Sequence, residues 1–182
     1  VGNCVVTENF DVDKITIFDL EKLFIDIRAQ YVSDIANVSY IDHTDEQTYS
    51  FDIPLKDIKI IWPIEKPPTI SIGEGMVMVM KWPAASLYSD ANLLSQDGPD
   101  AIDHLIIKCI HKIYAGEQTY DPAMYTTEDL LEFIQDLDSK AFEEIRSFFD
   151  KMPRLQYTIE FQNTKGEDRR IELSALTDFF QF

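Results

Sequence analysis

The sequence predicts an α+β fold that combines amphipathic helices with short antiparallel β-hairpins. Apolar residues recur at helical spacing in some segments and alternate with polar residues in others. One arrangement occurs twice, at residues 18–55 and 142–173, where an apolar-striped helix precedes an acidic, turn-rich hairpin and a short apolar tail. We therefore expect two related helix–hairpin units with comparable internal packing.

The first helix is expected to begin after Thr16, which can form a capping box with Asp19. Its apolar residues predict one buried stripe, formed by Leu20, Leu23, Phe24, Ile27 and Tyr31. The first hairpin then turns at residues 42–46. Its second arm reads as a half-buried strand in which the apolar members of the alternation are Tyr49, Phe51, Ile53 and Leu55.

Prolines bracket an extended connector at Trp62-Pro63 and Pro67-Pro68, because proline fits neither a helix interior nor a central strand. Residues 69–82 read as two strands joined at Gly73-Glu74-Gly75. One face of the second strand carries Met76, Met78, Met80 and Trp82. A face of methionines can form an adaptable binding surface, but such faces are more often core, and we expect core here.

Residues 100–114 are predicted to form a helix whose apolar stripe consists of Ile102, Leu105, Ile106, Cys109, Ile110 and Ile113. Cys109 is therefore expected to be a small core residue rather than a reactive thiol. His104 and His111 fall on the opposite face and are expected to be solvated. Lys108 lies between them, and its positive charge disfavours a metal ion at this pair.

Two further helices are predicted before the second hairpin. Thr126 or Thr127 caps the first of them, which carries Leu130, Leu131, Phe133, Ile134 and Leu137. Asp138-Ser139 caps the next helix, and Pro153 ends it. We expect either one compact unit or two regions: a helix, hairpin and strand region at 1–82, and a helical region ending in a helix–hairpin unit at 83–182. The opening Val1-Gly2-Asn3-Cys4 lacks an initiator Met, so we expect an N-terminal portion to be absent.

The chain is strongly acidic, with 33 Asp and Glu against 16 Lys and Arg and a formal net charge of −17. This charge disfavours direct binding to nucleic acid or to an anionic membrane, because both would be repelled. No apolar run is long enough to span a bilayer. A basic protein partner is the natural complement, and charge that serves solubility alone is the alternative. Cys4 and Cys109 lie far apart, which indicates no disulfide framework and suits a reducing cytoplasm.

No motif for catalysis was found in the sequence. It lacks the glycine-rich loops of nucleotide-binding proteins, the serine elbow of hydrolases, the histidine pair of zinc proteases and the spacing of calcium loops. The three histidines are scattered, and carboxylate pairs are inevitable in so acidic a chain. We therefore expect a non-enzymatic protein with no catalytic residues, no cofactor and no bound metal.

One acidic stretch is a candidate binding site for a partner. Between Glu117 and Glu144 nine acidic residues accompany a single base, Lys140. Within it a repeat of four residues stacks like charges on one helix face, at Glu128, Glu132 and Asp136. Our hypothesis is that this face steers a basic partner, and the alternative is ordinary solvated surface.

The aromatic residues near the C-terminal end could add a hydrophobic anchor for the same partner. They are Phe179, Phe180 and Phe182. The alternative is that they close the core, and this is the more common use of such residues.

A resemblance to a known family rests on several short motifs in a fixed order. They are Asn3-Cys4, residues 18–24 with Arg28-Ala29, residues 77–83, 109–117, 148–155, the hairpin at 157–173, and residues 176–180. Their order and spacing resemble the baseplate hub assembly proteins of T-even-type contractile-tailed phages, the gene 26 type of tail assembly chaperone. The resemblance covers nearly the whole chain.

The resemblance implies a non-enzymatic phage tail protein that assists or joins assembly of the central baseplate hub. Its partners would be other hub or tail proteins with basic surfaces, met in the host cytoplasm during assembly and then in the virion tail. One alternative is a permanent structural baseplate subunit of the virion. Another, from a different class, is an acidic adaptor or inhibitor of a basic protein.

Some proteins of this type carry cysteine pairs in their hairpin turns, in the manner of a zinc ribbon. Here the corresponding turns, residues 42–46 and 162–168, contain no cysteine. His43 alone cannot complete a structural zinc site, which needs four nitrogen or sulfur ligands. We therefore predict no zinc, and hairpins that are held by strand pairing and packing alone.

Overall fold

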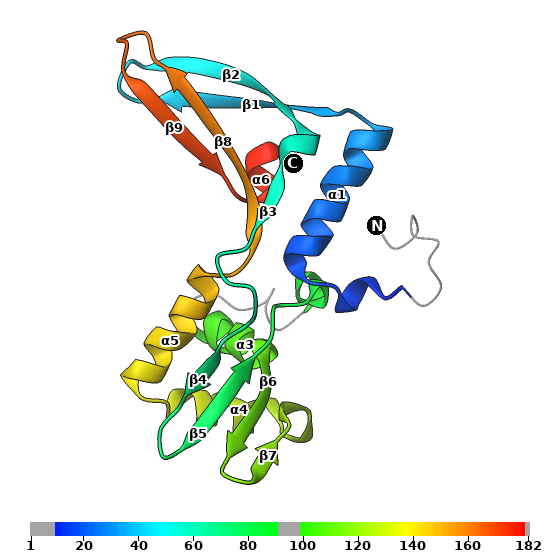
Figure 1. Ribbon diagram of the computed structural model, residues 1–182, viewed down its shortest axis with the longest axis vertical. Helices are drawn as coiled ribbons and strands as arrows, with labels where there is room; N and C mark the ends of the chain where they lie inside the picture. Colours follow the sequence, from blue (N-terminus) through cyan, green and yellow to red (C-terminus); the bar gives the residue numbers. More distant parts are fainter. Residues whose placement is uncertain (1–9, 91–98, 181–182) are drawn as a thin grey trace. The chain divides into compact units, whose positions relative to one another are not determined.

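The computed structural model of the chain describes residues 10–90 and 99–180 and confirms a mixed α+β fold. The chain forms two compact units, and each is assembled from segments that are distant in the sequence (Figure 1). Of the described residues, unit 1 contains residue 10 and residues 18–62 and 153–180, and unit 2 contains residues 11–17, 63–90 and 99–152. This division differs from the two regions expected from the sequence, residues 1–82 and 83–182. The second hairpin shares its core with the first helix and hairpin.

Unit 1 is built around two antiparallel hairpins and helix α1 (Ile17–Tyr31). Strands β1 (Ile35–Asp42) and β2 (Gln47–Pro54) form a two-stranded sheet. Strands β3 (Lys59–Ile61), β8 (Arg154–Gln162) and β9 (Asp168–Leu173) form a second sheet in the order β3-β8-β9. The turn η3 (Leu55–Asp57) precedes β3, and helix α6 (Leu176–Phe179) follows β9. The buried core includes Ile25, Ile53, Leu55, Ile58, Leu155 and Phe179.

The local predictions for the first hairpin are largely confirmed in unit 1. Strand β2 buries Ile53, half-buries Tyr49 and Phe51, and exposes the polar residues between them. Helix α1 begins directly after Thr16, and its buried residues Phe18 and Ile25 lie two turns apart on one face. The predicted stripe is wrong in its members, because neither Phe18 nor Ile25 was among them. Its residues Leu20, Leu23, Phe24 and Ile27 are half-buried, and Tyr31, in the last turn of the helix, is 75% exposed.

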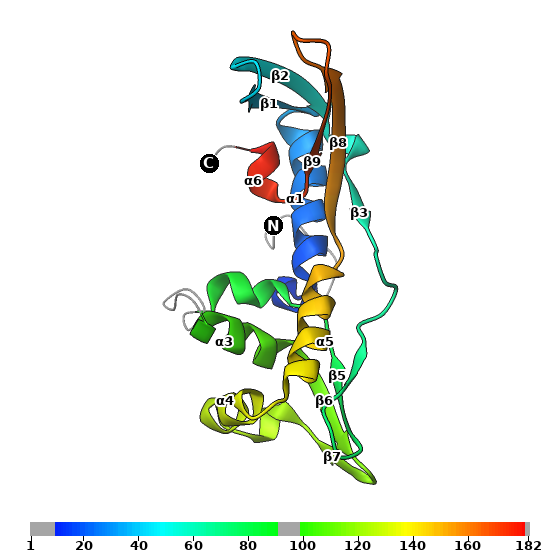
Figure 2. The same cartoon turned by 90° about the vertical axis from the view of Figure 1, so that its left-hand side faces the viewer.

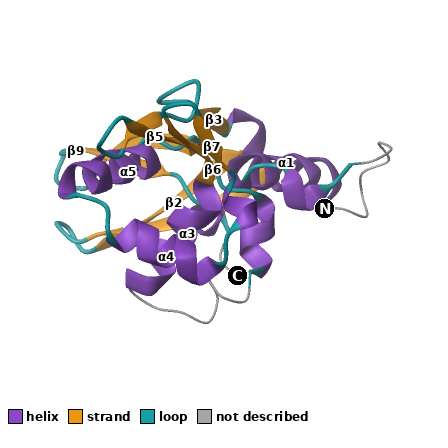
Figure 3. Cartoon of the chain, turned by 90° about the horizontal axis from the view of Figure 1, so that it is seen from below, coloured by secondary structure: helices purple, strands orange, loops and turns teal. Residues whose placement is uncertain are grey.

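Unit 2 is a four-stranded antiparallel sheet with helices packed on one face. The strands β4 (Thr69–Ser71), β5 (Met76–Met80), β6 (Ile110–Ala115) and β7 (Gln118–Tyr120) pair in sequence order. The helices are α3 (Pro99–Cys109), α4 (Thr127–Gln135) and α5 (Ser139–Asp150), and α3 and α4 lie on the same side of β5–β7 (Figures 2 and 3). Short turns η2 (Val12–Lys14), η4 (Ala85–Ser89) and η5 (Pro122–Met124) complete the unit. The core includes Ile70, Met78, Met80, Ile106, Ile110, Ile134, Ile145 and Phe148.

The turn between β4 and β5 and the methionine face agree with the predictions. Gly73, Glu74 and Gly75 all have positive φ, at 89°, 47° and 74°, which explains the two glycines in this turn. Met78 and Met80 are buried in the core of unit 2, whereas Met76 is half-buried at its edge.

The helix predicted at residues 100–114 is wrong in its last third. It ends at Cys109, and Ile110–Ala115 is strand β6. Met80 pairs with Ile110 while Val79 pairs with Lys112, so His111 is an extra residue that forms a β-bulge. The bulge places Ile110 and Ile113 on the same face of the sheet, at a spacing that also suits a helix.

The shortened helix changes the placement of several side chains. Ile102, predicted in the buried stripe, is 57% exposed. His104, predicted to be solvated, is buried, and His111 is exposed on the bulge. Cys109 is buried as predicted, and burial raises the pKa of its thiol to about 12.

The two helix–hairpin pairs differ in packing despite their similar sequences. Helix α1 and hairpin β1–β2 contribute to the same core, that of unit 1. Helix α5 buries Ile145 and Phe148 in the core of unit 2, whereas the hairpin that follows it belongs to unit 1. The expected comparable packing is therefore not found, because the chain leaves one core for the other between α5 and β8.

Candidate binding site

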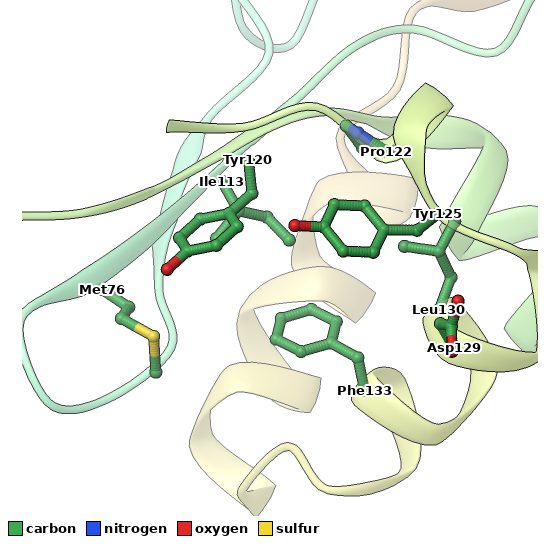
Figure 4. Close-up of a pocket in the computed structure, with 8 residues that line it drawn as sticks. All are labelled: Met76, Ile113, Tyr120, Pro122, Tyr125, Asp129, Leu130 and Phe133. Carbon is green, nitrogen blue, oxygen red and sulfur yellow. The ribbon is translucent and has the colours of Figure 1, made fainter. Parts of the chain in front are cut away.

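An apolar pocket of about 510 Å³ opens on unit 2 beside helix α4 (Figure 4). Five structural elements and the chain just after η5 form its walls. The lining residues are Met76 from β5, Ile113 from β6, Tyr120 from β7, Pro122 and Tyr125 from η5 and its end, and Asp129, Leu130 and Phe133 from α4. A pocket of this size and apolar character is typical of binding sites.

The chain between β7 and α4 brings two tyrosine rings together at the pocket. The Asp121 carboxylate accepts a hydrogen bond of 3.0 Å from the Ala123 N–H and so stabilises the η5 turn. The ring centroids of Tyr120 and Tyr125 are then 6.5 Å apart. Figure 4 shows the Tyr125 hydroxyl directed toward Tyr120, with the Phe133 ring beneath them.

Helix α4 forms the charged edge of the pocket. Thr126 is its N-cap, as one of the two predicted caps, and accepts a 3.2 Å hydrogen bond from the Asp129 N–H. The Asp129 carboxylate accepts hydrogen bonds from the Thr126 hydroxyl at 2.7 Å and from its N–H at 3.0 Å. These bonds lower the pKa of Asp129, so this carboxylate is ionised at neutral pH. Asp129 is the one charged residue among the eight that line the pocket.

Two residues of the predicted acidic stripe lie on the exposed surface of the same helix, and the third, Asp136, is its C-cap. Glu128, Glu132 and Asp136 are all exposed, and none of them makes an ion pair with a described residue. Successive residues of an α-helix are rotated by about 100° around its axis. This rotation places Asp136 almost in line with Asp129 along the helix, and Glu132 on the neighbouring row of side chains. The stripe therefore borders the pocket on the side away from Leu130.

The pocket itself was not predicted from the sequence. Its residues come from positions 76 to 133, and only the fold brings them together. The acidic stretch contains four aromatic residues, and three of them, Tyr120, Tyr125 and Phe133, line the pocket, so this set was the signal available in the sequence.

The C-terminal aromatic residues lie in unit 1, where they are core. Phe179 is 2% and Phe180 is 8% exposed. The Phe180 ring centroid is 5.9 Å from that of Phe24 and 4.5 Å from the Arg28 guanidinium carbon. The hypothesis that Phe179 and Phe180 form an exposed hydrophobic anchor is thus wrong, and the alternative, that they close the core, is confirmed. Phe182 lies outside the described residues.

The turns of the two hairpins in unit 1 meet in a polar network. The Asp42 carboxylate accepts hydrogen bonds from Arg169 Nε at 2.8 Å and from Asn163 Nδ2 at 3.1 Å. The Asp45 carboxylate accepts from the Thr164 N–H at 3.0 Å and from its hydroxyl at 2.7 Å. The expectation that strand pairing and packing alone hold the hairpins is therefore wrong, because side chains of one turn bind the other.

The same network keeps its carboxylates ionised. The Thr44 N–H, 2.8 Å from Asp42, makes the largest contribution to lowering the pKa of Asp42 to about 2, and Asn163 and Arg169 add to it. Burial acts to raise the pKa of Asp45, but hydrogen bonds from Thr164 and Tyr49 outweigh it and lower this pKa. The Arg169 pKa is raised, chiefly by Asp42.

Within residues 10–90 and 99–180, no group of three or more His, Cys, Asp and Glu side chains is placed to hold a metal ion. None of the helices in these ranges combines the length and the apolar character needed to cross a bilayer.

One protein family has a model that matches this chain. It is described as T4 bacteriophage base plate protein, and the match extends over residues 1–181. Comparisons with curated proteins and with solved structures gave no significant match. The family match includes the sequence of both units, and so takes in the pocket and the joined hairpin turns.

Proposed function

We propose a function from the premise that the chain belongs to the T4 bacteriophage base plate protein family. It is a phage baseplate protein, and this family suggests interaction with other baseplate proteins. The proposal is that the chain is non-enzymatic and assists or joins assembly of the central baseplate hub. It would do so in the host cytoplasm by binding hub or tail proteins that have basic surfaces.

The observation that carries this proposal is the acidic surface of α4 beside an open apolar pocket. Nine acids and one base between Glu117 and Glu144 leave a negative charge that repels itself in the free protein. A basic partner would relieve this repulsion, and the uncompensated charge would speed its encounter. An apolar pocket at the same place offers the desolvated contact on which affinity usually depends.

The lining of the pocket favours binding over catalysis. Seven of its eight residues carry no charge, and hydrogen bonds from Thr126 engage the Asp129 carboxylate. General acid–base catalysis typically uses a titratable group whose pKa lies near the working pH, whereas the pKa of Asp129 is lowered. These features support the assignment of the chain as a binding protein.

Co-purification from infected cells tests the proposal. The tagged chain would be isolated at low and at high salt, and the bound proteins identified by mass spectrometry. We expect hub or tail proteins with basic surfaces at low salt, and less of them at high salt. Isolation of the functional tagged chain without any tail protein would overturn the proposal.

The same tagged phage separates the two roles in assembly. If the chain is found in purified tails at constant stoichiometry, it is a permanent baseplate subunit. If it binds assembly intermediates but is absent from finished tails, it acts as a chaperone.

A further inference from the structure

We propose that the pocket of unit 2 receives one large apolar side chain from a basic segment of the partner. Lys or Arg residues on both sides of this side chain would bind the acidic residues of α4. The identification of the partner as a baseplate protein rests on the proposed function above. The chemistry of the occupant rests on the pocket alone.

The apolar lining of the pocket fits an aromatic or long aliphatic side chain. Ile113 and Leu130, both 8% exposed, form its apolar floor, while Tyr125 at the rim is 45% exposed. Met76 is half-buried at the edge, and a methionine side chain adapts to the shape of its occupant. Tyrosine-rich apolar pockets are favoured places for the residues that dominate protein–protein binding.

The acidic residues on α4 set the spacing of the basic residues in the partner. Asp129 and Asp136 are seven residues apart, or about 10 Å along the helix axis at ~1.5 Å per residue. Phe133 lies between them and belongs to the pocket wall. An extended peptide covers about 10 Å in three residues, at ~3.3 Å each. Because successive side chains of an extended chain point to opposite faces, the fitting sequence has two basic residues on each side of the apolar residue, so that one of each pair can face the helix.

The charge of the chain excludes a second copy of itself as the preferred occupant. Two copies that met through this surface would bring together two acidic α4 helices, from chains of net charge −17. A small anion would meet the same repulsion from Asp129, Glu132 and Asp136. A cationic segment with an apolar residue satisfies both the pocket and the helix.

The first test uses a fluorescently labelled peptide that has one phenylalanine between two pairs of lysines. Anisotropy would measure its binding to the full chain, to Tyr125→Ala and to Tyr114→Ala. Tyr114 is the matched control, because it is 37% exposed and follows the pocket residue Ile113 on β6, on the other face of the sheet. We expect Tyr125→Ala to weaken binding about tenfold and Tyr114→Ala to change it less than about twofold.

Altered peptides test the two halves of the proposal separately. Replacing the phenylalanine by alanine should weaken binding about tenfold, and replacing the lysines by glutamates should abolish it. Methyl NMR of the unmutated chain provides a readout that needs no variant. The signals of Met76, Ile113 and Leu130 should shift with the phenylalanine peptide and stay unchanged with the alanine peptide.

Equal binding of the phenylalanine and alanine peptides, or equal affinity of Tyr125→Ala and the unmutated chain, would overturn the proposal. Capture from infected cells separates it from the proposed function. If tail proteins co-purify equally with the unmutated chain and with folded Tyr125→Ala, the baseplate role stands and the pocket inference fails. If peptide binding depends on Tyr125 and no tail protein is captured, the pocket inference stands and the proposed role fails.

Discussion

Asp42 is 2% exposed and carries a negative charge that donors from both hairpin turns hold in place. A buried charge is costly unless it is paired and hydrogen-bonded, so the surrounding groups are required wherever this carboxylate is ionised. Sequence reading identified both turns but not their contact. The residues that meet lie about 120 positions apart, and local patterns contain no information on such a distance.

The stability of the chain should fall with acid in a range set by Asp42. Its pKa is about 2 in the folded chain, below the ordinary value of 3.8. A group whose pKa is lowered by folding contributes its full stability above the ordinary value and loses it as the pH falls through the folded one. We therefore expect Tm to decrease between about pH 4 and pH 2. Thermal unfolding of Asp42→Asn should show a shallower decrease there, and the exposed Asp57→Asn should retain the slope of the unmutated chain.

Removing Arg169 should destabilise unit 1 more than removing its neighbour on the same strand. Arg169→Ala leaves the buried Asp42 carboxylate without its ion-pair partner, and Arg170→Ala removes only a surface pair with Glu172. Thermal unfolding at pH 7 should thus give a distinctly lower Tm for Arg169→Ala. Similar Tm values for the two variants would mean that the contact between the turns adds little to stability.

At the scale of single elements, sequence patterns succeeded where one local rule applied. Helices α4 and α5 were predicted because each combines a capping residue, Thr126 or Asp138, with an apolar stripe. Strand β6 was missed because the bulge at His111 gives Ile110 and Ile113 a spacing of three, which suits a helix. Pairing with β5 determines that this segment is a strand, since Met78 and Met80 on β5 pair with Ile113 and Ile110.

The cap of α4 provides a test at this scale. Thr126 accepts the Asp129 N–H, whereas Thr127 is the exposed first residue of the helix. Thr126→Ala should lower the free energy of unfolding by about 1 kcal/mol. Thr127→Ala should change it by less than about 0.5 kcal/mol. Urea unfolding at pH 7 measures both, and the reverse order would assign the cap to Thr127.

The hairpin turns of unit 1 should hold together without a metal ion. Hydrogen bonds and an ion pair join the turns, and neither turn contains a cysteine. We predict that dialysis against a chelator leaves Tm unchanged and that elemental analysis finds no zinc near one equivalent. A fall in Tm on chelation that added zinc reverses would contradict this prediction.

At the scale of the whole molecule, the sequence indicated acidity and a binding role but not the assembly of the two units. Each core combines segments from distant parts of the chain. Dividing the sequence once, between residues 82 and 83, could therefore not separate the two units. The pocket shows the same limit, because its walls come from β5, β6, β7, η5 and α4. The charge on α4 was the part of the site that a single stretch of sequence could reveal.

Charge reversal on α4 tests whether that charge acts locally or through the total charge of the molecule. Glu128→Lys, Glu132→Lys and Asp136→Lys together change the formal net charge from −17 to −11, since each reversal adds two. If the α4 surface steers the partner, the association rate constant at low salt should fall about tenfold or more, and its dependence on salt should weaken. Stopped-flow measurements with the captured baseplate partner would provide these rates.

The matched control reverses three exposed acids elsewhere, Asp34, Glu65 and Glu160, and reaches the same net charge of −11. Circular dichroism should first show that both triple variants remain folded. Charges farther apart than a Debye length, about 10 Å at 0.1 M salt, are largely screened, so at this salt concentration the control should associate at nearly the rate of the unmutated chain. An equal fall in both variants would indicate that total charge governs the encounter, and α4 would then be ordinary solvated surface.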